Sequence, residues 1–234
     1  MTDRKLFAPD VIEKDGRYYL YAYIVGSKGV VGVSDKPEGP FTDHGKMFRS
    51  DEINVQNSID PFYIEDRGKK YLFWGSFRGI YGIELSNDGL SVKKGAKLHQ
   101  VAGTAYEGTY IHKKDDYYYF FASIGTCCEG LKSTYTTVVG RSKKLFGPYV
   151  DKNGKKMLDN HHEILIHKNE AFVGTGHNSE IVRDKAGNDW VLYHAVSTTS
   201  PGGRVLMLDK IDWKDGWPSV SGNSPSLEFE RPVL

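Results

Sequence analysis

The sequence predicts an all-β protein of the propeller class, and three observations support this. A strand, a Gly-bearing turn and a second aromatic-rich strand recur four times along the 234 residues. The 26 Gly and 15 Tyr suit a chain with many turns and aromatic strands. No stretch of helical length has an apolar period of 3.6 residues. Strand-built repeats of about 40 to 50 residues are typical of a β-propeller, whose innermost strands converge on a central axis.

A polar residue stands at the head of each repeat, at positions 10, 60, 107 and 177, with spacings of 50, 47 and 70 residues. The four heads lie in the motifs Ala8-Pro9-Asp10-Val11, Ser58-Ile59-Asp60-Pro61, Tyr106-Glu107-Gly108 and His177-Asn178-Ser179-Glu180. Equivalent strand heads of a propeller meet around its axis. We therefore expect Asp60, Glu107 and His177 to lie together there.

We expect one propeller domain over residues 1–234, because all-β folds of this length form single domains. A four-bladed ring is geometrically permitted. The blades are expected at about 7–50, 58–101, 106–170 and 174–220, followed by a C-terminal tail at 221–234. Their third strands are expected at 29–34, 79–85, 135–139 and 204–208.

The charge pattern argues against nucleic acid as a partner. The net charge is +1, from 31 basic and 30 acidic residues, and the lysine pairs are scattered over different turns. Phosphate binding needs a clustered basic surface. No apolar run approaches the roughly 18 residues of a membrane span, so a membrane partner is not expected either. A signal peptide on the full-length protein would imply an extracellular or periplasmic location, and otherwise a cytoplasmic one. The oligomeric state is left open.

The two cysteines, Cys127 and Cys128, are neighbours in the chain. A disulfide between adjacent residues closes a strained eight-membered ring, so we expect two reduced, partly buried thiols. Two sulfurs with no second Cys pair make a poor zinc site.

Two carboxylic acids in an aromatic-lined axial pocket suit glycoside hydrolysis, in which one acid protonates the leaving oxygen. A carboxylate at a strand head is more often a turn or cap residue, but recurrence of the position favours a functional role for Glu107 and Asp60. Glu107 lies between Tyr106 and Tyr110, and desolvation there would raise its pKa toward that of an acid catalyst. Asp60 would perturb and hold it from the next blade.

Asp10 and His177 are the other two polar heads. Asp10 lies six residues before Gly16, whereas Asp60 lies eight before Gly68, so we interpret Asp10 as a hydrogen-bonded turn or inter-blade residue. His177 could bind a metal or water at the axis, or hydrogen-bond within the core.

The chain resembles the endo-acting arabinanases of glycoside hydrolase family 43, which are five-bladed propellers that hydrolyse α-1,5-linked L-arabinan with inversion. The likeness covers nearly the whole chain, and the double-Cys segment is its sharpest signal. Beyond the four head motifs, it rests on Gly75-Ser76-Phe77, Tyr110-Ile111, Cys127-Cys128, Ser133-Thr134-Tyr135, Val139-Gly140-Arg141-Ser142, Gly147-Pro148-Tyr149, Asp151, Gly154, Met157 and Asp215-Gly216-Trp217-Pro218.

The resemblance implies a set of roles. Glu107 would be the general acid and Asp60 the carboxylate that tunes its pKa and orientation. His177 would hold an axial ion, often calcium, largely through water, and no organic cofactor is implied. The expected partner is an arabinose-containing plant polysaccharide or oligosaccharide. Substrate contacts are expected from Phe77, Ile59 and Tyr110.

The sequence also departs from the family pattern at several places. The family's general base lies in a blade that precedes the motif beginning at Ala8, so we expect it to have no counterpart here, and Asp3 is too near a free terminus for the role. The chain alone should then hydrolyse arabinan weakly at most. Thr109 stands where proline is usual, and 159–163 replaces a glycine-rich run.

Two alternatives stay open at this point. One is an exo-acting arabinofuranosidase or β-xylosidase of the same family, which would have a blocked pocket in place of an open groove. The other is a carbohydrate-binding propeller without catalysis. Loss of the base favours the second, whereas retention of Glu107 and Asp60 disfavours it.

Overall fold

The structure is a computed structural model that describes residues 6–24, 28–200, 202–228 and 231–234. Asp3 lies outside these residues. The fold is mostly β, as predicted. The chain forms two compact units, residues 1–109 and residues 110–234, and the boundary falls within one strand. No helix within the described ranges is long and apolar enough to span a membrane.

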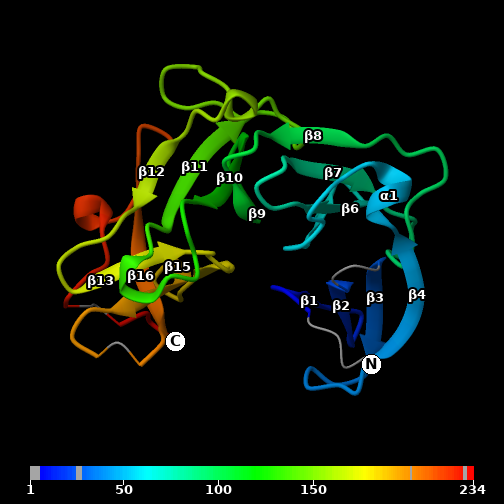
Figure 1. Ribbon diagram of the computed structural model, residues 1–234, viewed down its shortest axis with the longest axis horizontal. Helices are drawn as coiled ribbons and strands as arrows, with labels where there is room; N and C mark the ends of the chain where they lie inside the picture. The colour runs from blue at the N-terminus through cyan, green and yellow to red at the C-terminus, as the bar shows by residue number, and fades with distance from the viewer. Residues whose placement is uncertain (1–5, 25–27, 201, 229–230) are drawn as a thin grey trace. The chain divides into compact units, whose positions relative to one another are not determined.

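The first unit contains two four-stranded antiparallel sheets, each with its strands in chain order (Figure 1). The only α-helix among the described residues, α1 (Ser50–Ile53), connects them. One sheet consists of β1 (Asp10–Lys14), β2 (Arg17–Ile24), β3 (Lys28–Ser34) and β4 (Thr42–Phe48). The other consists of β5 (Phe62–Asp66), β6 (Lys69–Trp74), β7 (Ile80–Glu84) and β8 (His99–Ala102).

Tight turns explain why neighbouring strands pair. Asp15 and Gly16 both have positive φ between β1 and β2, and so do Arg67 and Gly68 between β5 and β6. Two such residues form the turn whose twist matches that of an antiparallel hairpin, and glycine takes this conformation without a steric penalty.

Stacked aromatic rings build the core of the first unit. Phe48 stacks on Trp74 with ring centroids 4.6 Å apart, and Tyr21 stacks on Tyr63 at 5.0 Å. Asp10 adds a polar link between the sheets, because its Oδ2 accepts the backbone N–H of Tyr63 at 2.7 Å. This contact confirms the interpretation of Asp10 as a hydrogen-bonded residue between repeats.

The second unit contains most of a larger sheet, in which strands run in the order β17-β16-β15-β13-β11-β10-β9; Figure 1 labels β9, β10, β11, β13, β15 and β16 of this sheet. In addition, β12 pairs with β11 and β14 with β15. The strands are β9 (Glu107–Lys114), β10 (Tyr117–Ile124), β11 (Thr136–Ser142), β12 (Glu163–Ile166), β13 (Phe172–Gly176), β14 (Ile181–Arg183), β15 (Asp189–Ser197), β16 (Arg204–Lys214) and β17 (Trp217–Ser219). Short 3₁₀ turns occur at Gly130–Lys132, Met157–Asp159 and Ser221–Asn223.

The sheets agree with the expected repeats in part. The two sheets of the first unit lie within the predicted ranges 7–50 and 58–101, apart from one residue at the end of β8. In the second unit a parallel pair, Thr136 with Thr175, joins β11 to β13, so the strands expected in two blades form one connected sheet. The division into four blades stays a prediction. The predicted third strands correspond to β3, β7, β11 and β16, and β16 runs on to Lys214.

The expectation of two reduced thiols is wrong, because the structure joins Cys127 and Cys128 by a disulfide. The pair lies in an irregular loop between β10 and β11, where no strand ladder restricts the backbone. Arg204 donates from its guanidinium to Cys127 O at 3.2 Å and to Cys128 Sγ at 3.1 Å. These contacts attach the loop to β16.

Replacing Asp10 by Ala should lower the free energy of unfolding by about 1 to 3 kcal/mol, because the part-buried N–H of Tyr63 loses its acceptor. Asp10→Asn, which keeps an acceptor oxygen, should cost less. Urea unfolding followed by tryptophan fluorescence measures both values. The exposed Asp35→Ala is the matched control and should change stability little. Equal losses for Asp10→Ala and Asp35→Ala would contradict the inter-sheet role.

Candidate functional site

Two carboxylates that the sequence singled out lie together in the first unit. Asp60 precedes β5 and Glu107 begins β9, and their exposed fractions are only 4% and 7%. Carboxylates are rarely buried to this degree without partners. Asp60 Oδ2 accepts the backbone N–H of Gly108 at 3.2 Å, so the residue after Glu107 contacts Asp60 directly.

The loop between β6 and β7 connects both carboxylate motifs. Gly75 donates its N–H to Ile59 O at 2.9 Å, and Phe77 donates its N–H to Tyr106 O at 2.8 Å. Between them, Ser76 donates from Oγ to Glu107 Oε2 at 2.7 Å. Ser76 is therefore a residue that orients Glu107. In the sequence, Ser76 stands out only as the middle residue of the motif Gly75-Ser76-Phe77.

Several residues of the site have unusual backbone conformations. Asp60 and Phe77 have φ values of 57° and 49°, in the left-handed region that non-glycine residues rarely adopt. Gly75 has φ 130°, and a Cβ there would lie 2.3 Å from Gly79 O. Such strain persists where surrounding contacts enforce it, and it often accompanies functional sites.

Burial is the largest influence on the pKa of Asp60. Desolvation, followed by the negative charge of Glu107, raises the pKa of Asp60 to about 7, although the N–H of Gly108 opposes this shift. The raised pKa that was expected from the sequence at Glu107 stays a prediction, and burial raises the pKa of Asp60. A large fraction of Asp60 is therefore protonated near neutral pH, beside a second carboxyl group.

The residues expected to contact substrate fall in different units. Ile59 and Phe77 are half-buried in the first unit and lie next to Asp60 and Ser76 in the chain. Tyr110 belongs to the second unit, where its hydroxyl accepts the N–H of Ile181 at 3.1 Å. Its ring packs against Phe121 with centroids 6.2 Å apart. The substrate-binding role of all three stays a prediction.

His177 belongs to the second unit, between β13 and β14. Its backbone N–H donates to Ser123 Oγ at 2.7 Å, and its ring lies 6.5 Å from that of His194. Burial, followed by the charges of Arg204 and His177, lowers the pKa of His194 to about 4, so His194 is neutral at pH 7.

The donor set near His177 is short of protein ligands for a metal. Across the described ranges, no group of three or more His, Cys, Asp and Glu side chains is arranged to hold an ion. Asn178 Oδ1 and His194 Nδ1 are buried and make no hydrogen bond within the described residues. These two acceptors suit bound water, so any ion here would depend on water for most of its ligands.

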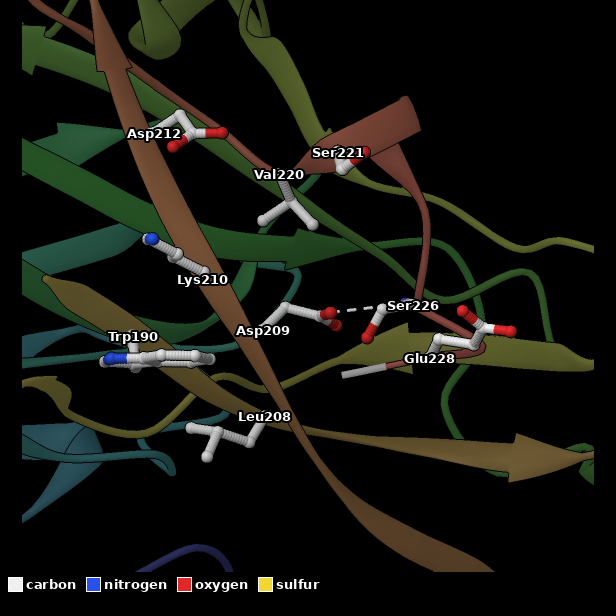
Figure 2. A pocket seen from close by; sticks show the side chains of 9 residues that line it. All are labelled: Trp190, Leu208, Asp209, Lys210, Asp212, Val220, Ser221, Ser226 and Glu228. Carbon is white, nitrogen blue, oxygen red and sulfur yellow. Dashed lines mark hydrogen bonds between the residues drawn. The ribbon is translucent and has the colours of Figure 1, made fainter. Parts of the chain in front are cut away.

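A separate pocket of about 340 Å³ opens in the second unit (Figure 2). Its lining residues are Trp190, Leu208, Asp209, Lys210, Asp212, Val220, Ser221, Ser226 and Glu228. The buried Asp209 accepts hydrogen bonds from Tyr193 Oη at 2.6 Å and from the N–H of Ser226 at 3.2 Å. This carboxylate thus joins β15, β16 and the C-terminal segment, which indicates a structural role.

Comparisons with known proteins identify relatives of this chain. The chain is 34% identical to an extracellular exo-α-(1→5)-L-arabinofuranosidase, ArbA, of Cellvibrio japonicus, over 93% of the chain and 70% of that protein. It is also 34% identical to extracellular endo-α-(1→5)-L-arabinanase 1 of Bacillus subtilis, over 91% of the chain and 68% of that protein.

A solved structure is similar as well. The α-L-arabinanase of Cellvibrio cellulosa, complexed with arabinohexaose, matches with a TM-score of 0.83 at 32% identity, over 93% of this chain and 78% of that one. The family model described as "Glycosyl hydrolases family 43" matches residues 1–218. The chain therefore belongs to glycosyl hydrolase family 43.

Proposed function

We propose that this protein cleaves α-1,5-linked L-arabinan by an inverting acid/base mechanism in which Glu107 is the general acid. The observation that carries the proposal is the buried pair of Asp60 and Glu107, held by Gly108 and Ser76. Inverting glycosidases need one protonated carboxyl group beside the leaving oxygen. The names of the arabinan-cleaving relatives support the choice of substrate.

In this mechanism Glu107 donates its proton to the glycosidic oxygen as the bond from that oxygen to the anomeric carbon breaks. A water molecule attacks the same carbon from the opposite face and loses a proton to a carboxylate base. Because Ser76 occupies Oε2 of Glu107, Oε1 is the oxygen left to carry the transferred proton. We assign no residue to the base.

Asp60 acts on Glu107 without touching the reacting atoms. Two neighbouring carboxyl groups do not both ionise readily, so a proton on Asp60 relieves the repulsion that arises when Glu107 becomes an anion. Asp60 is thus a positioning and pKa-tuning residue. Because the pKa of Asp60 is raised to about 7, a large fraction of Asp60 carries this proton near neutral pH.

Exo action is the second candidate, because one of the two relatives with 34% identity is named as an exo-acting enzyme. Products distinguish the two modes. An endo enzyme first releases a range of oligosaccharides from linear arabinan, whereas an exo enzyme releases one short product from the start. Binding of arabinan without any release of reducing ends would instead support the non-catalytic alternative.

We also propose that a calcium ion contacts His177 and is otherwise coordinated largely by water. Calcium prefers oxygen ligands and can fill its shell with water, and the buried Oδ1 of Asn178 is an acceptor available to such water. The disulfide leaves Cys127 and Cys128 without a thiolate for metal binding.

Glu107→Gln should lower hydrolysis of linear arabinan by about 10²- to 10⁴-fold, because the leaving oxygen loses its proton donor. An aryl arabinofuranoside with a good leaving group needs little protonation, so its hydrolysis should fall much less. Rates on both substrates, from reducing-end and chromophore assays, measure the difference. The exposed Glu170→Gln should leave both rates unchanged. Equal losses on the two substrates would argue against the acid role.

Asp60→Asn should make the protein more stable at pH 8 while lowering its activity. The pKa of Asp60 is raised from 3.8 to about 7 in the folded state, so its contribution to stability is fully present below about pH 4 and is lost as pH rises through 7. Removing the charge should therefore raise the free energy of unfolding on the order of 2 kcal/mol at pH 8, and less at pH 5.

Urea unfolding at the two pH values measures this gain. Asp88→Asn serves as the control, because hydrogen bonds from Ser86 and the N–H of Leu90 lower the pKa of Asp88. That substitution should cost stability at pH 8 and not increase it. A gain for Asp60→Asn that is the same at pH 5 and pH 8 would show that titration of Asp60 is not the cause.

Calcium should raise the melting temperature of the wild-type protein, and EDTA should lower it. His177→Ala should abolish the response, whereas the exposed His167→Ala and the double variant Cys127→Ser/Cys128→Ser should keep it. Metal analysis should find calcium in the wild type. Stoichiometric zinc that disappears in the double cysteine variant would overturn the proposal.

A further inference from the structure

A basic pocket of about 350 Å³ lies in the second unit, at the ends of β10 and β11. Its lining residues are Tyr117, Arg141, Ser142, Lys143, Lys144, Gly147, Pro148 and Val150. Three of these side chains are cationic and none is acidic. Because the whole chain carries a net charge of only +1, this excess of positive charge is local.

Arg141 is the fixed centre of the basic pocket. Its guanidinium lies over the rings of Tyr117 and Trp217, with 4.4 Å to each centroid, and Nη1 donates to Gly216 O. Rings and carbonyl groups orient a guanidinium without cancelling its net charge. Arg141 is therefore pre-organised and remains a full positive charge at the pocket.

Two lysines reinforce this charge. Lys143 Nζ lies 5.6 Å from the centroid of Tyr117, and Lys144 is exposed beside it. Neither they nor Arg141 form an ion pair with a residue that the structure describes; the nearest ion pair in sequence is Lys152 with Glu163, at 3.9 Å. An unpaired cationic cluster in a concave site concentrates field and attracts anions.

The shape and the remaining walls narrow the class of anion. The volume is at the lower end of the range for small-molecule sites, which suits a single compact unit and not a long strand of nucleic acid. Pro148 and Val150 add apolar surface, and Ser142 adds a hydroxyl group. Nη1 of Arg141 already donates to Gly216 O and Asp215 O, so its positive charge and those of the two lysines attract a carboxylate without a two-pronged contact. The hydroxyl and apolar walls suit a sugar ring.

We propose that this basic pocket is a second carbohydrate site, which binds the carboxylate of a uronic acid residue. The choice of a sugar acid over other carboxylates rests on the proposed function, because for an enzyme that acts on polysaccharide the carboxylate of a ligand belongs to a sugar residue. Such a site would hold the enzyme on acidic polysaccharide while a neutral arabinan chain occupies the site of Asp60 and Glu107.

Calorimetric titration with trigalacturonate at low salt tests the proposal. The wild type should bind it, and 300 mM NaCl should weaken binding several-fold because exposed charges are screened. The charge reversal Lys143→Glu/Lys144→Glu should raise Kd at least ten-fold. The control Lys94→Glu/Lys97→Glu makes the same change of charge at two exposed lysines of the first unit and should alter Kd less than two-fold. Arg141→Gln should also weaken binding, with folding checked by its melting temperature.

Three results would overturn the proposal. Equal binding of the methyl ester of trigalacturonate would show that the carboxylate is not recognised, and equal binding of inorganic phosphate would show an unspecific anion site. Equal losses in the two lysine double variants would show an effect of overall charge. Glu107→Gln should bind trigalacturonate as the wild type does. In the wild type, binding of trigalacturonate without hydrolysis of arabinan would refute the proposed function alone, and hydrolysis without binding would refute this inference alone.

Discussion

The burial of two neighbouring carboxyl groups is the constraint on which the candidate site depends. Asp60 and Glu107 are almost inaccessible to solvent, and each has a specific donor: the N–H of Gly108 for Asp60 and the hydroxyl of Ser76 for Glu107. Burial without such donors would cost several kcal/mol per charge. With them, the cost appears as a raised pKa of Asp60 and as a proton held near neutral pH.

The first unit's backbone enforces this arrangement. The loop after β6 donates hydrogen bonds to Ile59 O and Tyr106 O. Asp60 and Phe77 both have left-handed φ values beside these contacts. The rings of Phe48 and Trp74 stack in the core of the same unit. The burial of this charge lowers stability, and such a cost is common where residues are kept for function.

In the second unit, positive charge is organised in a comparable way by aromatic rings. Arg141 lies over Tyr117 and Trp217 and keeps its charge, while His194 is neutral because burial lowers its pKa to about 4. The loop with the Cys127 to Cys128 disulfide is attached to β16 through Arg204. Aromatic rings and hydrogen bonds, more than ion pairs, position Arg141 and Arg204.

The sequence by itself determined the β class and the family, and it singled out Asp60 and Glu107, because strand and turn patterns and short motifs are local signals. It also indicated the inter-sheet role of Asp10 by an offset in spacing. The disulfide, the orienting contact of Ser76 and the raised pKa of Asp60 were decided by the tertiary structure. Each depends on distances between segments far apart in the chain or on how far the fold excludes water. Neither of these quantities follows from residues that are neighbours in the sequence.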